Sequence, residues 1–331
     1  MIYVSLPTSN TKKLSFFLAM EEYVARNVNT ADDCFFMWQV EPSVIFGRNQ
    51  LIESELNLDY CHQHHINTFR RKSGGGCVYA DMNNIMFSYI TRSENVAYTF
   101  ERYIDMVVEM LRSLGVDATT SGRNDILIAD RKVSGNAFYH IPHHSIVHGT
   151  MLYDTDMQNM VATLTPSDDK LISKGIKSVR QRIALLKDYI NLDIEQFKTY
   201  TKHFLCQSEL TLTPEDVVAI EDIEKEYLSP DFIMGNNPRY TKVNKMRIES
   251  VGELEARLEI RNNIIKAINI LGDYFLLEDI NSQIISPLIG QPYTKEAISE
   301  ALPEHTELII RNLNKQQLTE LLYGKQTNLS L

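Results

Sequence analysis

The segment at residues 70–79 holds the densest group of residues that could do chemistry, and it reads RRKSGGGCVY. Glycines let backbone N–H groups approach an anion without obstruction by side chains, and neighbouring cations balance the charge of a phosphate. The spacing fits neither the P-loop pattern nor the dinucleotide-binding pattern G-x-G-x-x-G. On its own, the segment fits an anion-binding loop or a strand bend that carries solvated cations.

Two further polar clusters follow, SGRND at residues 121–125 and RKVSGNA at residues 131–137. If Lys132 points into a cleft lined by strands, its ammonium neutralises a phosphate and a carboxylate together, as acyl transfer to a nucleotide requires. Asp125 would hold Mg²⁺ through one carboxylate, since this ion takes few protein ligands. The alternative for Lys132 is an exposed lysine on a solvated strand.

Five motifs occur in an order that resembles the lipoate-protein ligase A family. They are RRxSGGGxVY at residues 70–79, SGRND at 121–125, RKVSGxA at 131–137, HGT at 148–150 and KGIxSVR at 174–180. The resemblance spans essentially the whole chain, including the early AMEE and GR segments at residues 19–22 and 47–48. It also includes YTxEAI at residues 293–298, near the end of the chain.

The resemblance implies an enzyme that joins lipoate to ATP, releases pyrophosphate and passes the lipoyl group from AMP to a specific lysine. Its protein substrates would be apo lipoyl domains of 2-oxoacid dehydrogenase complexes or the glycine cleavage H protein, and octanoate is an alternative acid. ATP and Mg²⁺ would be the co-substrate and metal. The implied fold is α+β, a mixed-sheet catalytic domain of the class II synthetase and biotin-lipoate ligase type with a small α+β accessory domain.

The resemblance also assigns site residues position by position, with Lys132 as the catalytic residue. The residues expected to bind ATP are Arg71, Gly76, Cys77, Val78, Tyr79 and Lys132. Those expected to bind lipoate are Lys132, Arg70, Ser73, Gly74, Gly75, His148, Gly149 and Glu21. Asp125 is the expected Mg²⁺ ligand.

The chain departs from the family pattern after the glycine strand, where the family usually has His-Asp-x-Gly-Asn and this sequence has ADMNN at residues 80–84. Because Asn tolerates positive φ better than other non-glycine residues, Asn83 is expected to preserve the turn. Ala80 removes a hydrogen-bonding side chain beside the site, so we expect an effect on substrate orientation or rate.

Strands and amphipathic helices must position these residues. Strand patterns occur at residues 2–6, 34–40, 43–46, 125–129, 132–138 and 145–153. The second and third are separated only by a short segment containing Pro42 and are expected to be neighbours. Helix patterns occur at residues 14–25, 103–114 and 191–228. Glu21 falls on the apolar face of the first helix, so its carboxylate is either paired in the core or aimed into a site.

The turn residues and prolines at residues 230–238 are typical of a connection between domains. We therefore expect a catalytic domain at residues 1–243 and an accessory domain at 244–331. In the second domain, residues 245–258 and 264–275 alternate like strands, and residues 278–322 carry short helical segments.

The chain has 331 residues, with 33 Lys plus Arg against 43 Asp plus Glu and a formal net charge of −10. This balance argues against nucleic acid and against an anionic membrane, because both partners require basic clusters. Arg70, Arg71, Lys72 and Lys132 form a small basic island in this acidic background. Four cysteines without C-x-x-C spacing, and no apolar run of about 18 residues, predict a cytoplasmic protein with reduced thiols.

Three alternatives compete with the ligase hypothesis. Histidines at residues 62–65 and 140–148 lack the spacing of a tetrahedral site, so no structural zinc is expected. Cys77 as a nucleophile would indicate an ATP-independent octanoyl or lipoyl transferase, although no histidine base can be assigned to it. A degraded, non-catalytic protein that binds lipoate or a lipoyl domain is supported only by Ala80.

Overall fold

The structure, a computed structural model, describes residues 1–8, 11–50, 52–93, 95–164, 179–234 and 241–324. The chain divides into two compact units. The first comprises Met1–Phe46, Ile52–Lys72 and Cys77–Ile233, and the second comprises Gly47–Leu51, Ser73–Gly76 and Met234–Leu331. Two short segments from the early part of the sequence therefore group with the C-terminal part.

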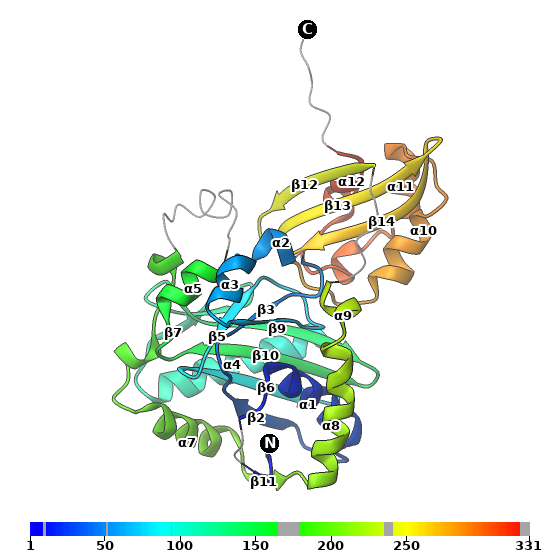
Figure 1. Cartoon of the computed structure of the whole chain (residues 1–331). Coiled ribbons are helices and arrows are strands. Elements are labelled where there is room, and N and C mark those ends of the chain that lie inside the picture. The colour runs from blue at the N-terminus through cyan, green and yellow to red at the C-terminus, as the bar shows by residue number, and fades with distance from the viewer. Residues whose placement is uncertain (9–10, 51, 94, 165–178, 235–240, 325–331) are drawn as a thin grey trace. The chain divides into compact units, whose positions relative to one another are not determined.

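The first unit is built on an eight-stranded mixed sheet (Figure 1). In spatial order its strands are β11 (Ser208–Thr211), β1 (Ile2–Ser5), β2 (Cys34–Trp38), β6 (Asn84–Thr91), β10 (His144–Leu152), β9 (Arg131–Ile141), β8 (Asp125–Ile128) and β7 (Ala118–Thr120). The strands β11, β1 and β2 run parallel, and the other neighbours are antiparallel. The mixed sheet with its helices confirms the predicted α+β class.

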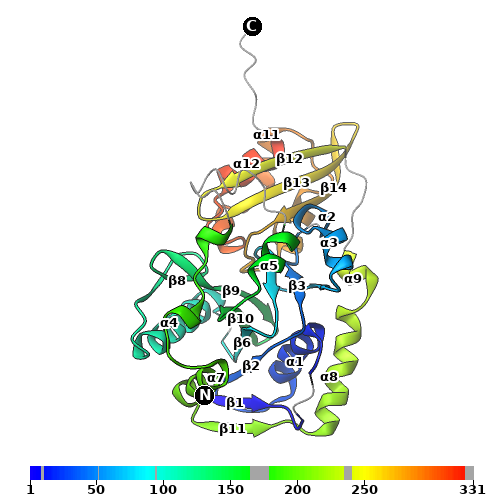
Figure 2. The same cartoon turned by 60° about the vertical axis from the view of Figure 1, so that its left-hand side comes forward.

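Helices cover both faces of this sheet (Figures 1 and 2). They include α1 (Leu14–Asn27), α4 (Val96–Ser113), α7 (Ile194–Leu205) and α8 (Pro214–Tyr227). Successive residues of a strand point to opposite faces. On β10, His148 bonds to Glu21 of α1, whereas the space above the next residue, Gly149, is filled in part by Tyr103 of α4. The helices α1 and α4 therefore lie on opposite faces.

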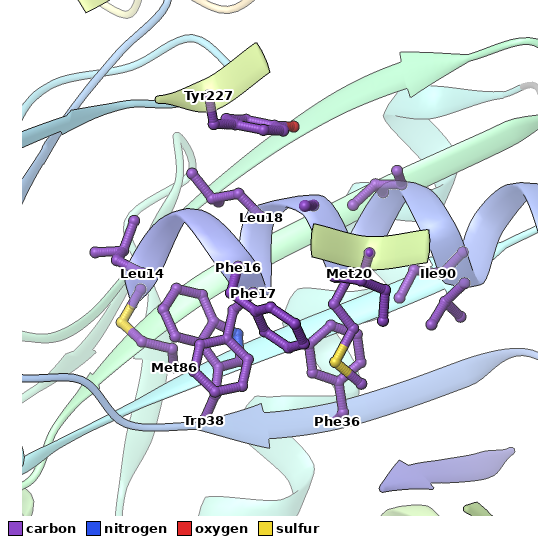
Figure 3. Packing of buried hydrophobic residues seen from close by; sticks show 14 of the residues in the cluster. Leu14, Phe16, Phe17, Leu18, Met20, Phe36, Trp38, Met86, Ile90 and Tyr227 are labelled. Atoms are coloured by element: carbon purple, nitrogen blue, oxygen red, sulfur yellow. The ribbon is translucent and has the colours of Figure 1, made fainter. Parts of the chain in front are cut away.

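The helix α1 is buried on both sides, because it lies between the sheet and α8 (Figure 3). Phe17 stacks on Trp38 of β2, with ring centroids 4.9 Å apart and 14° between the planes. On the other side, Leu18 faces Tyr227 of α8. Burying an aromatic or aliphatic side chain contributes about 1.5–3 kcal/mol, so the apolar sequence of α1 reflects two packed surfaces.

A second sheet in the first unit has the order β4 (Asn67–Arg70), β3 (Ser43–Phe46) and β5 (Val78–Ala80). The expectation that β2 and β3 are neighbours was wrong. Both edges of β2 are already paired, with β1 and with β6. The chain therefore leaves the large sheet at Pro42, and β3 pairs with β4 and β5 instead. The short helices α2 (Ile52–Glu55), α3 (Leu58–Gln63) and α5 (Met157–Thr163) complete this region.

One local prediction needs correction. The segment at residues 191–228 is not helical throughout, because β11 lies between α7 and α8 as an exposed edge strand paired with β1. The expected connection begins with a helix, α9 (Pro230–Met234), and residues 235–240 lie outside the described part of the chain.

The C-terminal part of the second unit has three antiparallel strands, β12 (Lys242–Ile248), β13 (Gly252–Arg261) and β14 (Ile264–Gly272). Its helical segments are Asn281–Ile285, α10 (Ser286–Leu288), α11 (Lys295–Ala301), Thr306–Leu308 and α12 (Lys315–Tyr323). The alternation predicted for residues 245–258 is broken by a turn in which Ser250 has a φ of 66°. Within the described residues, no helix has the length and apolar character to cross a membrane.

Candidate functional site

Five of the predicted site residues line one cavity of the first unit, which has a volume of about 340 Å³. Cys77, Val78 and Tyr79 come from β5 and the residue before it, Asp125 begins β8, and Lys132 lies on β9. The other lining residues are Ser121, Leu127, Asp130, Thr150, Leu152, Met160, Leu164, Arg182 and Ile183. The cavity thus joins the small sheet to one end of the large sheet.

Lys132 and Asp125 form an ion pair in this cavity, with 2.9 Å between Nζ and Oδ1. Their side chains are 34% and 23% exposed, so both remain accessible to a ligand. The register places Gly135 opposite Asp125. A Cβ atom on Gly135 would lie 2.5 Å from Lys132 Nζ, so the absence of a side chain there lets the lysine lie across the strand. This explains the spacing of lysine and glycine in the motif.

Arg71 is almost completely buried beside β3, where its NH1 group donates to the carbonyl of Ile45 at 3.3 Å. Burial lowers the pKa of the Arg71 guanidinium to about 10. The charged form is therefore costly at this position, and a phosphate oxygen would offset that cost. Arg70 is also buried, with Nε donating to the Ile233 carbonyl at 2.9 Å and the guanidinium 4.6 Å from the centre of the Phe46 ring.

Glu21 and His148 meet beneath α1, with 2.9 Å between Oε2 and Nδ1. The Glu21 carboxylate also accepts a hydrogen bond from Ser88 at 2.6 Å, and Ser88 accepts one from Trp38 Nε1 at 2.9 Å. The side chains of Glu21 and His148 are 0% and 7% exposed. The structure therefore brings together two residues expected at the acyl pocket and gives the carboxylate the partners that its burial requires.

A side chain at Gly149 would face the opposite side of the sheet from this pair. A Cβ atom on Gly149 would lie 1.9 Å from Asn136 Oδ1 and 3.0 Å from the hydroxyl of Tyr103. The glycine makes room for a side chain of β9 on the face that α4 covers, and this packing explains the residue type without a ligand.

The remaining residues of the glycine segment, Ser73, Gly74, Gly75 and Gly76, belong to the second unit. The backbone carbonyl of Ser73 accepts the N–H of Arg48 at 2.9 Å. The N–H of Gly75 donates to the carbonyl of Tyr274 at 3.1 Å.

The turn after β5 differs from the one expected. Asn83 does not adopt a positive φ. The carboxylate of Asp81 accepts the N–H of Asn83 at 2.9 Å, and the backbone carbonyl of Asp81 accepts the N–H of Asn84 at 3.1 Å. A hydrogen bond accepted by the Asp81 carboxylate therefore shapes the turn. Ala80 is fully buried among the core residues around α1.

A second cavity of about 470 Å³ opens where β1 and β2 diverge beyond their pairing at Tyr3 and Phe35. It is larger, but its described lining contains none of the predicted site residues. The smaller cavity combines a lysine, two aspartates and an arginine, and this chemistry makes it the candidate active site.

Comparison with known proteins agrees with this geometry. The chain matches the lipoyl protein ligase A/B catalytic domain over residues 14–205, and it matches the bacterial lipoate protein ligase C-terminus over residues 237–322. The chain belongs to the lipoate-protein ligase family. The resemblance read from the five motifs is confirmed, and the protein is an enzyme of this kind.

Three relatives illustrate this membership. Lipoate-protein ligase LplJ of Bacillus subtilis is 31% identical, over 98% of this chain and 100% of its own. The structure of Plasmodium falciparum LipL1 in complex with lipoate has a TM-score of 0.75 at 23% identity, covering 98% of both chains, and shows a shared fold. A bipartite lipoate protein ligase from Thermoplasma acidophilum, analysed with its E2 lipoyl domain, has a TM-score of 0.62 at 26% identity. It covers 73% of this chain and 98% of that one.

Sequence reasoning missed several residues of this ligase's cavity. Asp130 lies in the tight turn between β8 and β9 with a φ of 58°, and Arg182 follows the fifth motif. Arg182 lies two residues after the end of that motif, and a charged residue so close to a motif is a signal that could have identified it. The motif segment at residues 174–178 lies outside the described residues, and only the backbone of Val179 and Arg180 is placed.

Proposed function

We propose that this ligase activates lipoate with ATP and transfers the lipoyl group to a lysine of an apo lipoyl domain. The observation that carries the proposal is the ion pair of Lys132 and Asp125 in the cavity lined by residues 77–79. A lysine held by one partly exposed carboxylate can exchange that partner for a phosphate and an acyl carboxylate. The family membership and the motif order support the same reaction.

In the first half-reaction, a carboxylate oxygen of lipoate attacks the α-phosphorus of ATP. The bond from that phosphorus to the bridging oxygen breaks, and pyrophosphate leaves. We propose that the ammonium of Lys132 lies between the α-phosphate and the carboxylate and reduces the repulsion between the two anions. The buried guanidinium of Arg71 would add positive charge near the phosphates, and residues 76–79 would contact the nucleotide.

In the second half-reaction, the neutral ε-amine of the acceptor lysine attacks the acyl carbon of lipoyl-AMP. The carbon–oxygen bond to AMP breaks, an amide forms, and the amine proton is released. We propose that Lys132 remains close to the leaving phosphate during this step, so that both half-reactions depend on it.

Mg²⁺ remains part of the proposal. No group of three or more His, Cys, Asp or Glu residues suited to a metal occurs among the described residues. Mg²⁺ in nucleotide sites commonly takes one or two carboxylates and completes its shell with phosphates and water. Asp125 fits that requirement, since its carboxylate lines the cavity and is partly exposed. When bound, the ion would neutralise charge on the ATP phosphates.

We further propose that the acyl chain lies near the pair of Glu21 and His148, with Arg70, residues 73–75 and the backbone of Gly149 as the remaining lipoate contacts. The catalytic domain would comprise residues 1–243 and the accessory domain residues 244–331. The protein substrates would be apo lipoyl domains, as the lipoyl-domain partner of the Thermoplasma acidophilum ligase suggests. We expect the enzyme to act in the cytoplasm.

The alternative of a Cys77-dependent transferase receives less support. Cys77 lines the cavity, but the described lining residues include no histidine that could act as its base. The match to a ligase C-terminus over residues 237–322 also favours the ATP-dependent reaction.

Lipoate-dependent exchange of labelled pyrophosphate into ATP tests the proposal directly, because only the adenylating enzyme catalyses it. We expect exchange with lipoate and none without it. Absence of exchange, together with octanoyl transfer from an octanoyl carrier protein to an apo lipoyl domain in the absence of ATP, would overturn the ligase in favour of the transferase. Binding of lipoate without either reaction would indicate the degraded protein.

A further inference from the structure

In the first unit, Lys72, the residue before the glycine segment, forms a cluster with Glu22 and Tyr227. Glu22 and Tyr227 are buried, and the Lys72 side chain is 21% exposed. Glu22 is 3% exposed. Its Oε1 lies 2.8 Å from Lys72 Nζ and accepts a hydrogen bond from the hydroxyl of Tyr227. The second carboxylate oxygen lies 3.4 Å from a guanidinium nitrogen of Arg26. Three elements therefore converge on one carboxylate: α1, the end of β4 with its following residues, and the end of α8.

The cluster is held by more than one contact. Lys72 Nζ also lies 2.8 Å from Glu226 and 4.9 Å from the centre of the Tyr227 ring. Burial raises the pKa of the Tyr227 hydroxyl, which therefore stays protonated and continues to donate. A buried carboxylate is tolerated only with good partners, and losing one partner leaves a costly uncompensated charge. The position of the Lys72 ammonium is consequently well defined, and Lys72 is not a free member of a basic island.

The residues on both sides of Arg71 have defined contacts. On one side, the Nε atom of Arg70 donates to the carbonyl of Ile233 in α9 at 2.9 Å. On the other side, Lys72 forms an ion pair with Glu226, and its ammonium lies over the ring of Tyr227 at the end of α8. Arg71 lies between these two anchors, with its backbone N–H donating to the carbonyl of Phe46 at 3.0 Å. The segment from α8 to α9 thus holds the residues on both sides of the buried guanidinium.

We infer that Glu22, Lys72 and Tyr227 are positioning residues that hold Arg71 in place for the nucleotide phosphates. The inference rests on the proposed function, because it takes Arg71 as an ATP contact. Catalysis is sensitive to placement, since a misplacement of about 1 Å can reduce a rate by about two orders of magnitude. Position 72 is the one that the family motif RRxSGGG leaves open, so this role comes from the contacts of this chain.

The decisive variant is the double substitution Glu22→Gln with Lys72→Met. It removes both charges together, so that neither is left buried alone, and it preserves side-chain volume and an acceptor for Tyr227. In the lipoate-dependent exchange reaction, we expect the KM for ATP to rise by about tenfold, with the KM for lipoate within about twofold of the wild type. The melting temperature should change by only a few degrees. Lys72→Arg, which keeps the charge, should retain a KM for ATP within about threefold of the wild type.

The helix α8 offers a matched control. Lys225 and Asp222 form an ion pair of 2.7 Å in which both side chains are 76% exposed. The double substitution Asp222→Asn with Lys225→Met should leave both KM values and the melting temperature unchanged.

The outcomes separate the two proposals. A wild-type enzyme without exchange activity defeats the proposed function itself. This inference alone is overturned if the wild-type enzyme shows exchange activity and the folded double variant has an unchanged KM for ATP. If the double variant does not fold, Tyr227→Phe takes its place, because it removes one hydroxyl and keeps the ring. A rise of about threefold in the KM for ATP supports the inference, and no rise overturns it.

Discussion

At the scale of single residues, the site depends on the ion pair between Asp125 and Lys132 and on the packing of the Lys132 side chain against Gly135. The carboxylate holds the ammonium at 2.9 Å, and the glycine leaves the space in which the lysine side chain lies. Because the pair is partly exposed, it contributes about 0–1 kcal/mol to stability. Its importance is therefore expected in catalysis rather than in folding.

Lys132→Ala tests this expectation. The variant should lose adenylation and acyl transfer by about two or more orders of magnitude, because both steps need the ammonium beside the phosphate. The melting temperature should stay close to that of the wild type. Pyrophosphate exchange and single-turnover transfer from lipoyl-AMP measure the two steps separately. Full activity in either assay would contradict the role assigned to Lys132.

Gly135→Ala should act through Lys132. The added Cβ would lie 2.5 Å from the lysine Nζ and Cε atoms, so the ammonium must move. We expect the rate of adenylation to fall by about 10- to 100-fold. In the Lys132→Ala background, Gly135→Ala should not reduce the rate of adenylation any further, since the lysine side chain that it would displace is absent. An additional loss of activity there would mean that Gly135 acts independently of the lysine.

Sequence reasoning was effective where chemistry and spacing coincide. The motifs predicted residues 77–79, Asp125 and Lys132, and the structure brings these into one cavity. It was less effective where a contact depends on long-range packing. Nothing near Lys72 in the sequence indicates that its partners come from residues 22, 226 and 227, and nothing near Gly149 indicates the amide of Asn136 that fills its space.

At the scale of elements, three acidic side chains of α8 have partners in α1 or in the residues just before it. Glu221 lies 2.8 Å from Lys12, Ser15 donates to Glu224, and Tyr23 donates to Asp216. The helix pattern alone predicted α1 and most of α8, but not that the two pack together. Likewise, the strand pattern predicted β3 but not its sheet, because the choice depends on whether both edges of β2 are already paired.

The hydrogen bond from Tyr23 to Asp216 predicts a defined pH dependence. It raises the pKa of Tyr23 to about 12 and lowers that of Asp216 below 3.8. Because the pKa of Tyr23 is raised, its contribution to the stability of the folded state is complete below pH 10 and is lost as pH rises towards 12. Because the pKa of Asp216 is lowered, its contribution to stability is present above pH 3.8 and is lost as pH falls below that value. Tyr23→Phe should therefore reduce the free energy of unfolding by about 0.5 kcal/mol, equally at pH 5, 7 and 9.

Urea unfolding at these three pH values measures the effect. Tyr98→Phe is the matched control, because Tyr98 is 59% exposed on α4 and should show no change. A deficit for Tyr23→Phe that disappears at pH 5 or pH 9 would contradict the assigned partners.

At the scale of the whole molecule, the two units are interleaved in sequence. Gly47–Leu51 and Ser73–Gly76 group with the C-terminal residues, although both segments are flanked by residues of the first unit. Composition and turn signals predicted a single boundary near Val243 and could not predict this arrangement. The reason is physical, since the grouping depends on backbone contacts such as those from Gly272 N–H to the Asn49 carbonyl and from Gly75 N–H to the Tyr274 carbonyl.

The glycine triplet therefore has a structural role inside the second unit that two matched substitutions can test. A Cβ atom on Gly74 would lie 2.2 Å from the Tyr274 carbonyl oxygen and 3.3 Å from Phe275 Cα, both backbone atoms. A Cβ atom on Gly76 would meet only Asp273 Cβ, at 3.9 Å. Gly74→Ala should reduce the free energy of unfolding by about 1–3 kcal/mol, because backbone must move apart. Gly76→Ala should stay within about 0.5 kcal/mol of the wild type.

Hydrogen exchange at the Gly75 amide gives a local measure of the same difference, because its N–H is the donor to Tyr274. Exchange there should accelerate in Gly74→Ala and remain slow in Gly76→Ala, since only the first substitution forces the acceptor away. This readout is independent of activity, so it separates packing within the second unit from any contact of the glycines with nucleotide. Equal stability and equal protection in the two variants would show that the close approach of Gly74 to Tyr274 does not hold this segment.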